Sequence, residues 1–199
     1  MEKPTLVFAT GNLNKLSEVK EVIGDFANLI SLKDINCTEE IPETTGTING
    51  NALQKARYVK THYGKDCFSD DTGFEVHGID DEPGVDAAFY AGPQRNADEN
   101  ISKVLSKLGD NPNRSARFIT VIALVLDGQE YTFEGIVDGQ VLKAKRGTGG
   151  FGYDPIFVPN GYDKTFAEME LHTKNKISHR SRAVLKLKEF LQNYRKETV

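Results

Sequence analysis

Cysteine is scarce in this chain, with only Cys37 and Cys67 among 199 residues. Neither has a histidine or a second cysteine at the spacing of metal ligands, which argues against a zinc site of the finger or ribbon type. Two isolated cysteines also argue against a disulfide-stapled secreted protein. We therefore expect both to be buried free thiols in a reducing compartment.

Long apolar runs are missing as well. No stretch approaches the length needed to cross a bilayer, and the first residues lack the basic flank and apolar core of a signal peptide. The sequence therefore predicts a cytoplasmic protein without membrane contact. Internal repeats, low-complexity tracts and breaks in composition that would mark a linker are absent too, so we expect one domain over residues 1–199.

There is no excess of basic residues. The chain has 25 lysines and arginines against 29 acidic residues, which gives a formal net charge of −4. A nonspecific nucleic-acid binder needs a broad basic face that neutralises phosphates, so the charge argues against a nucleic-acid partner. Any basic residues that bind phosphate must be clustered locally.

The spacing of apolar residues predicts a mixed α/β fold. We expect helices over residues 13–23, 50–63, 96–108 and 179–194. Within the last of these, the spacing predicts buried Val184, Leu185, Leu187 and Leu191. We expect strands over residues 5–9, 29–32, 67–69, 74–76, 116–126 and 130–138, the last two joined as a hairpin at Asp127-Gly128.

The first candidate site follows strand 5–9, where Thr10-Gly11-Asn12 leads into a helix with Lys15 one turn inside. A helix N-terminus offers unsatisfied amides and a positive dipole end to a polyanion, and a lysine adds a mobile positive charge. The pattern is typical of a polyphosphate site. The alternative is that this is a common strand-turn-helix connection of an α/β fold, in which one glycine serves the turn and binds no ligand.

The second candidate site is acidic. Asp70-Asp71 lies at the predicted tip of strand 67–69, where a carboxylate can hold Mg²⁺ or take a proton from water. Adjacent strand residues point opposite ways, so we expect Asp71 to face the site and Asp70 to cap turn amides; the alternative is that both only cap a turn before Gly73. Glu43, in the polar loop 38–46, is a second candidate metal ligand, although alone it would be interpreted as solvated.

The third candidate site is the glycine-dense segment 147–155, whose spacing matches neither the dinucleotide nor the phosphate-loop fingerprint. Phe151 offers a flat face for a base, and Asp154 offers an acceptor for a ring N–H. The alternative is a wide turn with Phe151 in the core. Lys174 and Ser178-His179-Arg180, at the start of the last helix, either read a carbonyl oxygen of a base or form a solvated basic face.

Together and in this order, these segments resemble the inosine triphosphate pyrophosphatase family. The resemblance covers nearly the whole chain. It is carried by residues 10–18, 43–46, 51–56, 69–73, 83–84, 147–155 and 178–180.

The resemblance implies an elongated mixed β-sheet with flanking helices, two lobes around a central cleft, and a homodimer. It also implies Mg²⁺-dependent hydrolysis of deaminated purine nucleoside triphosphates (ITP, dITP, XTP) to the monophosphate and pyrophosphate, which cleanses the nucleotide pool. Its residue assignments are Thr10, Gly11, Asn12, Lys15, Lys55 and Thr72 for the triphosphate, Glu43 and Asp71 for the metal, and Phe151, Gly152, Tyr153, Asp154, Lys174, His179 and Arg180 for the rest of the substrate. Asp71 is also the position that the family uses as proton acceptor.

Two positions depart from the family pattern. Phe89 stands where relatives usually have an arginine, and Asn49-Gly50 stands where they often have a glutamate. Neither change touches the expected metal ligands. The alternatives are a nucleotide sensor that lost turnover, a pyrophosphatase for other modified nucleotides, and an RNA-binding module, which the overall acidity disfavours.

Overall fold

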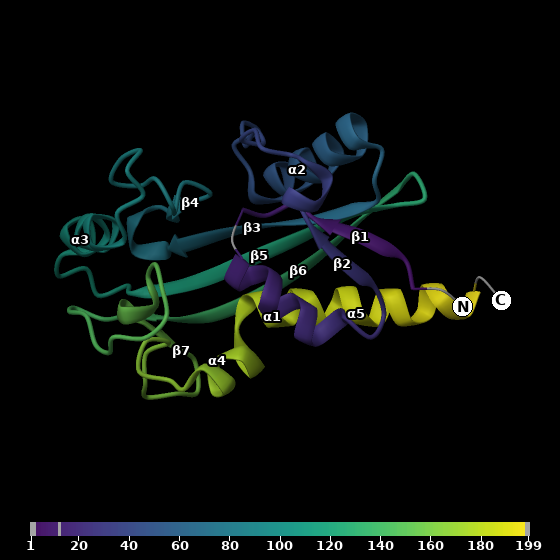
Figure 1. Cartoon of the computed structure of the whole chain (residues 1–199). Helices are drawn as coiled ribbons and strands as arrows, with labels where there is room; N and C mark the ends of the chain where they lie inside the picture. Colours follow the sequence, from purple (N-terminus) through teal and green to yellow (C-terminus); the bar gives the residue numbers. More distant parts are fainter. Residues whose placement is uncertain (1–2, 12, 198–199) are drawn as a thin grey trace. The chain divides into compact units, whose positions relative to one another are not determined.

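The structure is a computed structural model that describes residues 3–11 and 13–197. The chain forms two compact units, each assembled from separate segments. Unit 1 takes residues 1–71, 120–135 and 182–199, and unit 2 takes residues 72–119 and 136–181. Figure 1 shows the elements coloured along the sequence.

The described residues form a seven-stranded mixed sheet. Its order is β2 (Asn28–Ser31), β1 (Thr5–Phe8), β3 (Cys67–Val76), β5 (Ser115–Leu126), β6 (Gln129–Val141) and β7 (Phe157–Pro159), with β4 (Glu82–Gly84) paired to β3. β1 runs parallel to β2 and β3, whereas β4 and β7 are antiparallel to their neighbours β3 and β6. The predicted α/β fold class is confirmed.

The helices are α1 (Leu13–Ile23), α2 (Ile48–Tyr63), α3 (Ala97–Leu108), α4 (Leu171–Ile177) and α5 (His179–Glu197). The described residues also form three short 3₁₀ segments, η1 (Lys33–Ile35), η2 (His77–Ile79) and η3 (Asp154–Ile156). Asn96 caps α3 by accepting from the backbone N–H groups of Asp98 and Glu99, as its residue type favours. Within the part of the chain that the structure describes, no helix has the length and apolarity needed to cross a bilayer.

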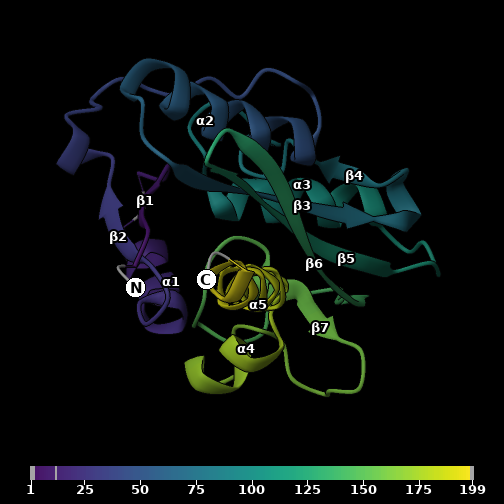
Figure 2. The same ribbon diagram turned by 90° about the vertical axis from the view of Figure 1, so that its right-hand side faces the viewer.

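In unit 1, helices cover both faces of β1, which explains why its residues after the exposed Thr5 are all apolar and buried. Figures 1 and 2 agree in placing α1 and α5 on one face of β1 and β2, and α2 on the other. Leu6 and Phe8 share a core cluster with residues of α1 and α5. Cys67, which pairs with Val7 in register, donates its S–H to the Ala56 carbonyl oxygen of α2. Two-sided burial of this kind is typical of parallel strands.

Unit 2 is built on an aromatic core. The ring of Phe74 stacks on Tyr153 with centroids 4.6 Å apart, and Phe118 meets Phe157 edge-on at 4.8 Å. The Tyr153 hydroxyl donates to the Ala87 carbonyl oxygen at 2.7 Å. These contacts attach the glycine-dense segment to the sheet.

Three details of the predicted elements were wrong. Segments 67–69 and 74–76 are one strand, β3, so Asp70 and Asp71 lie within a strand and not at its tip. They lie just past the end of β1, whose register with β3 stops at Phe8–Phe68. Lys174 belongs to a separate helix, α4.

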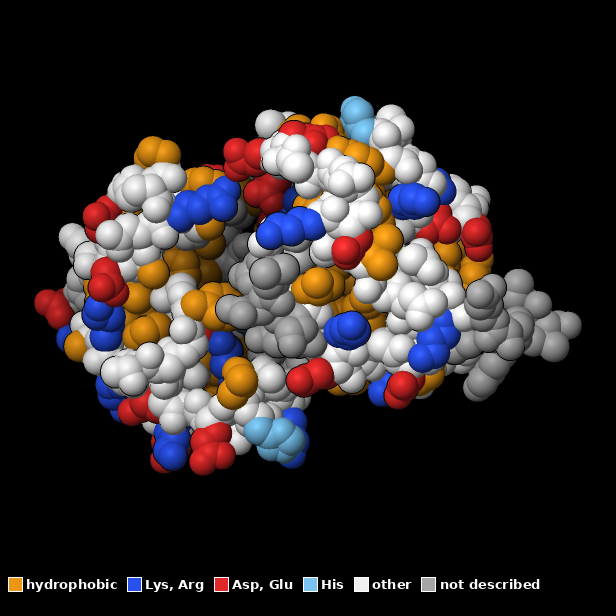
Figure 3. All heavy atoms as spheres, in the orientation of Figure 1, with side chains coloured by type: hydrophobic (Ala, Val, Ile, Leu, Met, Phe, Trp, Pro, Cys, Tyr) orange, Lys and Arg blue, Asp and Glu red, His pale blue; other side chains and the backbone are white. Residues whose placement is uncertain are grey.

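Leu185 is also not buried. Its side chain is 45% exposed, whereas Val184, Leu187 and Leu191 are buried at helical spacing. One residue along an α-helix turns the side chain by about 100°, so Leu185 falls outside the stripe that its neighbours define. On the face that Figure 3 shows, cationic and anionic side chains are interspersed, in keeping with the balanced composition.

Candidate active site

Strand β3 presents two adjacent carboxylates to different lysines. Asp70 is 2% exposed, and its Oδ2 lies 2.8 Å from Nζ of Lys15. Lys15 lies in the first turn of α1, the helix that follows β1 after the turn at Thr10-Gly11. The lysine that the sequence assigns to phosphate therefore also compensates a buried charge.

Asp71 lies beside α2. Its Oδ1 is 3.5 Å from Nζ of Lys55, and the same ammonium group donates to Oε1 of Glu43. The Lys55 and Asp71 side chains are only 12% and 14% exposed. The two expected metal ligands, Glu43 and Asp71, are thus brought to one lysine from segments that are distant in the sequence.

The environment of Asp71 favours a shared proton or a bound cation. Burial raises the pKa of Asp71 to about 6, and the charges of Glu43 and Asp70 act in the same direction, while Lys55 opposes them. Oδ2 of Asp71 is buried and has no hydrogen-bond partner among the described residues. Since buried polar atoms are nearly always satisfied, this oxygen is a position where a ligand is expected.

Lys55 stays charged in this setting. Burial alone would lower the pKa of its ammonium group, but Asp71, Asp70 and Glu43 together raise the pKa above its ordinary value. Three carboxylates therefore share the positive charges of Lys55 and Lys15. The cluster can exchange these internal partners for the phosphates of a ligand.

The carboxylates also fit a magnesium ion. Within the described residues, no three His, Cys, Asp or Glu side chains are placed so that all of them could hold one metal ion. Mg²⁺ does not need such a group, because it is usually held by one or two carboxylates together with water and substrate phosphates. Glu43 and the buried, unpartnered Oδ2 of Asp71 supply that minimal set among the described residues.

The Thr10 turn is only partly described. The Thr10 N–H donates to the Phe8 carbonyl oxygen at 2.8 Å, and a Cβ atom added at Gly11 would meet nothing within 4 Å. Gly11 therefore faces open space. Asn12, the third residue of the predicted phosphate turn, lies outside the described residues.

In unit 2, the glycine-dense segment presents Phe151 and buries Asp154. Phe151 is 55% exposed, whereas Asp154 is 2% exposed. Oδ2 of Asp154 accepts from the Phe151 backbone N–H at 2.8 Å and from Nζ of Lys174 at 2.5 Å. Gly150 has φ +70°, and a Cβ atom there would collide with that same oxygen. The alternative interpretation, which placed Phe151 in the core, is therefore wrong.

Two cations flank the exposed ring of Phe151. Nζ of Lys174 lies 4.7 Å from the ring centroid, and Cζ of Arg180 lies 5.5 Å from it. His179 is 4% exposed and stacks on Phe118 with centroids 4.6 Å apart. The burial of these basic residues excludes the solvated basic face that the sequence left open.

The other predicted residues of this unit have distinct places. Gly152 has φ +58° and open space where a side chain would begin, while the side chain of Tyr153 packs in the aromatic core. Thr72 follows Asp71 on β3. The predicted site residues thus fall in both units. Lys15, Glu43, Lys55 and Asp71 lie in unit 1, whereas Thr72 and the group of Phe151, Asp154, Lys174, His179 and Arg180 lie in unit 2.

Sequence reasoning missed the residues that hold the Glu43 loop. Thr44 and Thr45 are hydrogen-bonded to Gln54 and Asn51 of α2. The positions of these two α2 residues, together with Lys55, follow the helical spacing that brings side chains to one face. That spacing was the signal that could have found them.

A sequence model described as the Ham1 family matches residues 6–190, which include every predicted site residue. The chain belongs to the Ham1 family. The dITP/XTP pyrophosphatase of Flavobacterium johnsoniae is 54% identical over 186 residues, which are 94% of this chain and 97% of that protein. The dITP/XTP pyrophosphatase of Christiangramia forsetii is also 54% identical over 186 residues, which are 94% of this chain and 98% of that protein.

Solved Ham1 structures share the fold. A HAM1 protein from Coxiella burnetii superposes with a TM-score of 0.91 at 34% identity, covering 96% of this chain and 99% of that one. The names of the curated relatives confirm the resemblance that the sequence motifs carried. Ham1 membership thus extends over the site residues of both units.

Proposed function

We propose that this Ham1-family chain is a Mg²⁺-dependent nucleoside triphosphate pyrophosphatase that hydrolyses dITP, ITP and XTP to the monophosphate and pyrophosphate. Relatives named dITP/XTP pyrophosphatase at 54% identity support the substrate class. The observation that carries the mechanism is the state of Asp71, whose buried Oδ2 lacks a hydrogen-bond partner within the described residues and whose pKa is raised to about 6.

Attack of water on the α-phosphorus requires positive charge at the phosphate oxygens and a carboxylate that orients or deprotonates the water. Lys15 and Lys55 supply the charge in this proposal. Asp71 is the proton acceptor, since a carboxylate of pKa about 6 is ionised at neutral pH and basic enough to take a proton as the bond forms. Glu43 and Asp71 would hold Mg²⁺, which when bound neutralises the phosphate oxygens and the pyrophosphate that leaves.

Lys55 has a second role in the free protein. Its ammonium group lies against both Glu43 and Asp71, so it compensates two carboxylates that would otherwise repel each other. We propose that the triphosphate takes over Lys55 on binding. The carboxylates are then released for the metal.

The base would be read by the group in unit 2. Phe151 offers an exposed ring for stacking, and Asp154 holds both the Phe151 backbone and Lys174 in place. We propose that His179 and Arg180 donate to the 6-oxo group of hypoxanthine or xanthine. Adenine carries an amino group there, and each donor left without an acceptor costs about 1–3 kcal/mol, or roughly tenfold to a hundredfold in selectivity.

The test is pyrophosphate release from ITP, XTP, dITP, ATP, GTP and dUTP, with Mg²⁺ and with EDTA. We expect Mg²⁺-dependent release from the first three and little from the others. Silence across the panel with tight ITP binding would indicate a sensor, and preference for dUTP would indicate a different modified nucleotide. A homodimer, expected from the resemblance, is checked on the same preparation by sedimentation equilibrium.

A further inference from the structure

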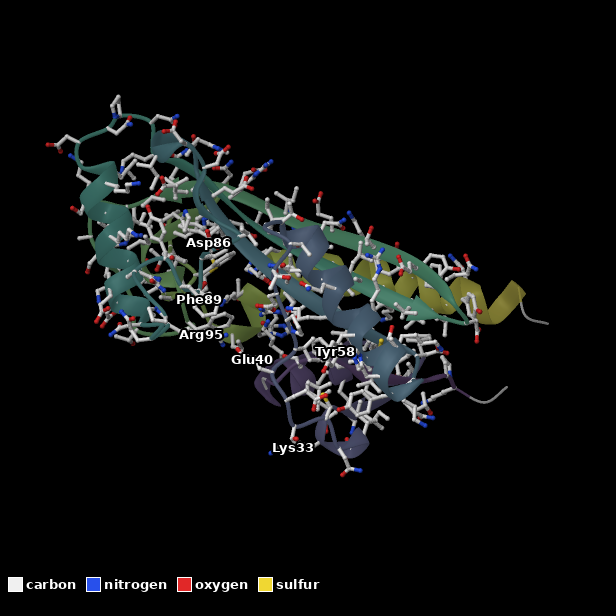
Figure 4. All side chains as sticks on the ribbon, turned by 90° about the horizontal axis from the view of Figure 1, so that it is seen from above. Lys33, Glu40, Tyr58, Asp86, Phe89 and Arg95 are labelled. Atoms are coloured by element: carbon white, nitrogen blue, oxygen red, sulfur yellow. The ribbon has the colours of Figure 1, made fainter. Side chains whose placement is uncertain are left out.

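The loop that carries Glu43 has almost no core of its own. Residues 36–47 connect η1 to α2, and after the buried Cys37 the only apolar side chain of the segment that is partly buried is that of Ile41. Figure 4 labels Glu40 in this loop and Tyr58 on α2. Because few apolar contacts fix the segment, its conformation depends on its hydrogen bonds.

One face of α2 supplies those bonds. Asn51, Gln54, Lys55 and Tyr58 are spaced at i, i+3, i+4 and i+7, which places them on one side of the helix. Each of the four contacts the loop through its side chain. The helix therefore acts as the support on which the loop is laid.

Gln54 makes the most specific contact. Its Oε1 accepts from the Thr44 backbone N–H at 2.8 Å, and its Nε2 donates to Oγ1 of Thr44 at 2.9 Å. The next residue, Thr45, donates from its backbone N–H to Oδ1 of Asn51 at 3.1 Å. The two backbone amides directly after Glu43 are thus held by α2 side chains.

The other side of Glu43 is held through Glu39. Oε1 of Glu39 accepts from the hydroxyls of Tyr63 at 2.6 Å and Tyr58 at 3.2 Å. The Tyr63 bond is the main reason that the pKa of Glu39 falls to about 2, so this carboxylate is ionised throughout the neutral range. Glu43 therefore lies between two anchored points of the loop.

We propose that Gln54 is a positioning residue for the divalent cation: with the Glu39–Tyr63 contact, it fixes loop 38–47 on α2 so that Glu43 stays beside Lys55 and Asp71. This inference rests on the proposed function and names the residues that set its metal requirement. A carboxylate held in place binds a cation without the entropic cost of ordering its loop. Loss of such outer support typically weakens metal affinity by about tenfold to a hundredfold.

The experiment compares Gln54→Leu, which removes both bonds to Thr44, with Gln54→Glu, which keeps an acceptor for the Thr44 N–H. Arg57→Ala is the matched control, because Arg57 is on the same helix and pairs with Glu130 away from the loop. Tyr63→Phe tests the second anchor by removing one hydroxyl. Three quantities are measured: amide hydrogen exchange of Thr44 and Thr45 without metal, Mg²⁺ affinity by calorimetry, and the Mg²⁺ dependence of dITP hydrolysis.

We expect Gln54→Leu to speed exchange of the Thr44 amide and to raise the Mg²⁺ requirement about tenfold or more, with kcat at saturating Mg²⁺ nearly unchanged. Gln54→Glu should retain much of the wild-type Mg²⁺ affinity. Tyr63→Phe should weaken Mg²⁺ binding as Gln54→Leu does, but by less. Arg57→Ala should change none of the three quantities. An unchanged Mg²⁺ affinity in Gln54→Leu, or an equal change in Arg57→Ala, would overturn the inference.

Failure of the proposed function would look different. A wild-type protein that releases no pyrophosphate at any Mg²⁺ concentration would reject the enzyme assignment. The exchange and calorimetry measurements would still decide whether Gln54 positions Glu43, because neither depends on turnover.

Discussion

Nζ of Lys55 lies 3.5 Å from Oδ1 of Asp71, while Oδ2 of the same carboxylate is buried and has no hydrogen-bond partner in the described part of the chain. Half of this carboxylate is thus satisfied and half is not. A buried carboxylate oxygen without a hydrogen-bond partner lowers the stability of the free protein, and unsatisfied or perturbed groups of this kind cluster at functional sites.

Asp71→Asn should nearly abolish hydrolysis and, in EDTA at pH 7.5, stabilise the fold. The folded pKa of Asp71, about 6, exceeds its ordinary value of 3.8, so folding favours the protonated form and stability rises as the pH falls from above 6 to below 4. At pH 7.5 the ionised carboxylate therefore costs about 1–3 kcal/mol. Calorimetric melting at pH 7.5 and 4.5 should show an advantage of the variant that shrinks at the lower pH. Substantial residual hydrolysis would reject the catalytic role.

Lys15→Met should destabilise unit 1 by about 2–4 kcal/mol, because Asp70 is nearly fully buried and loses this ion pair. Adding Asp70→Asn should recover most of the loss. Urea unfolding of the two single variants and the double variant measures the coupling. Lys60→Met, which breaks the more exposed pair with Asp66, is the control and should cost less than about 1 kcal/mol. Similar losses for the two lysines would contradict the prediction.

Phe151→Ala should raise KM for dITP about tenfold or more with little change in stability. The ring is more than half exposed, so the fold gains little from it, whereas stacking on a base is worth about 1–3 kcal/mol. Steady-state kinetics and thermal melting separate the two effects. Leu171→Ala, at a still more exposed apolar position of unit 2, should alter neither KM nor melting. An unchanged KM in Phe151→Ala would remove the ring from base binding.

Cys67 should resist alkylation in the native protein. Its side chain is fully buried, its S–H donates to the Ala56 carbonyl oxygen at 2.9 Å, and burial raises the pKa of the thiol to about 12. At pH 8 the thiolate that reacts with iodoacetamide is therefore almost absent. Mass spectrometry should show labelling of Cys67 only after denaturation. Rapid labelling in the native state would be the opposite result.

Much of the fold could be predicted from periodicity. Helices α1, α2, α3 and α5 and the hairpin of β5 and β6 carry long apolar patterns or a clear turn, Asp127-Gly128, whose two residues have positive φ. β4, β7 and α4 are three to seven residues long, too short for a pattern to show. β3 was divided in two because Asp70, Asp71 and Gly73 are poor strand formers, and pairing with β5 overrides that preference.

The residue types of the site could also be predicted, but their partners could not. Lys15 and Asp70 are 55 positions apart, and only the parallel pairing of β1 with β3 brings them together. The engagement of Asp154 by Lys174 depends likewise on where α4 packs. The roles of the site residues, the dimer and the compartment stay predictions.

Gly150 and Gly152 both have positive φ, yet they differ in whether another residue can replace them. Around Gly152 there is space, so an asparagine, which tolerates this backbone conformation, can replace it at small cost. Any side chain at Gly150 would displace the Asp154 oxygen that holds Phe151 and Lys174. In the proposed base site, base preference is therefore expected to change through the aromatic and basic side chains, with glycine kept at position 150.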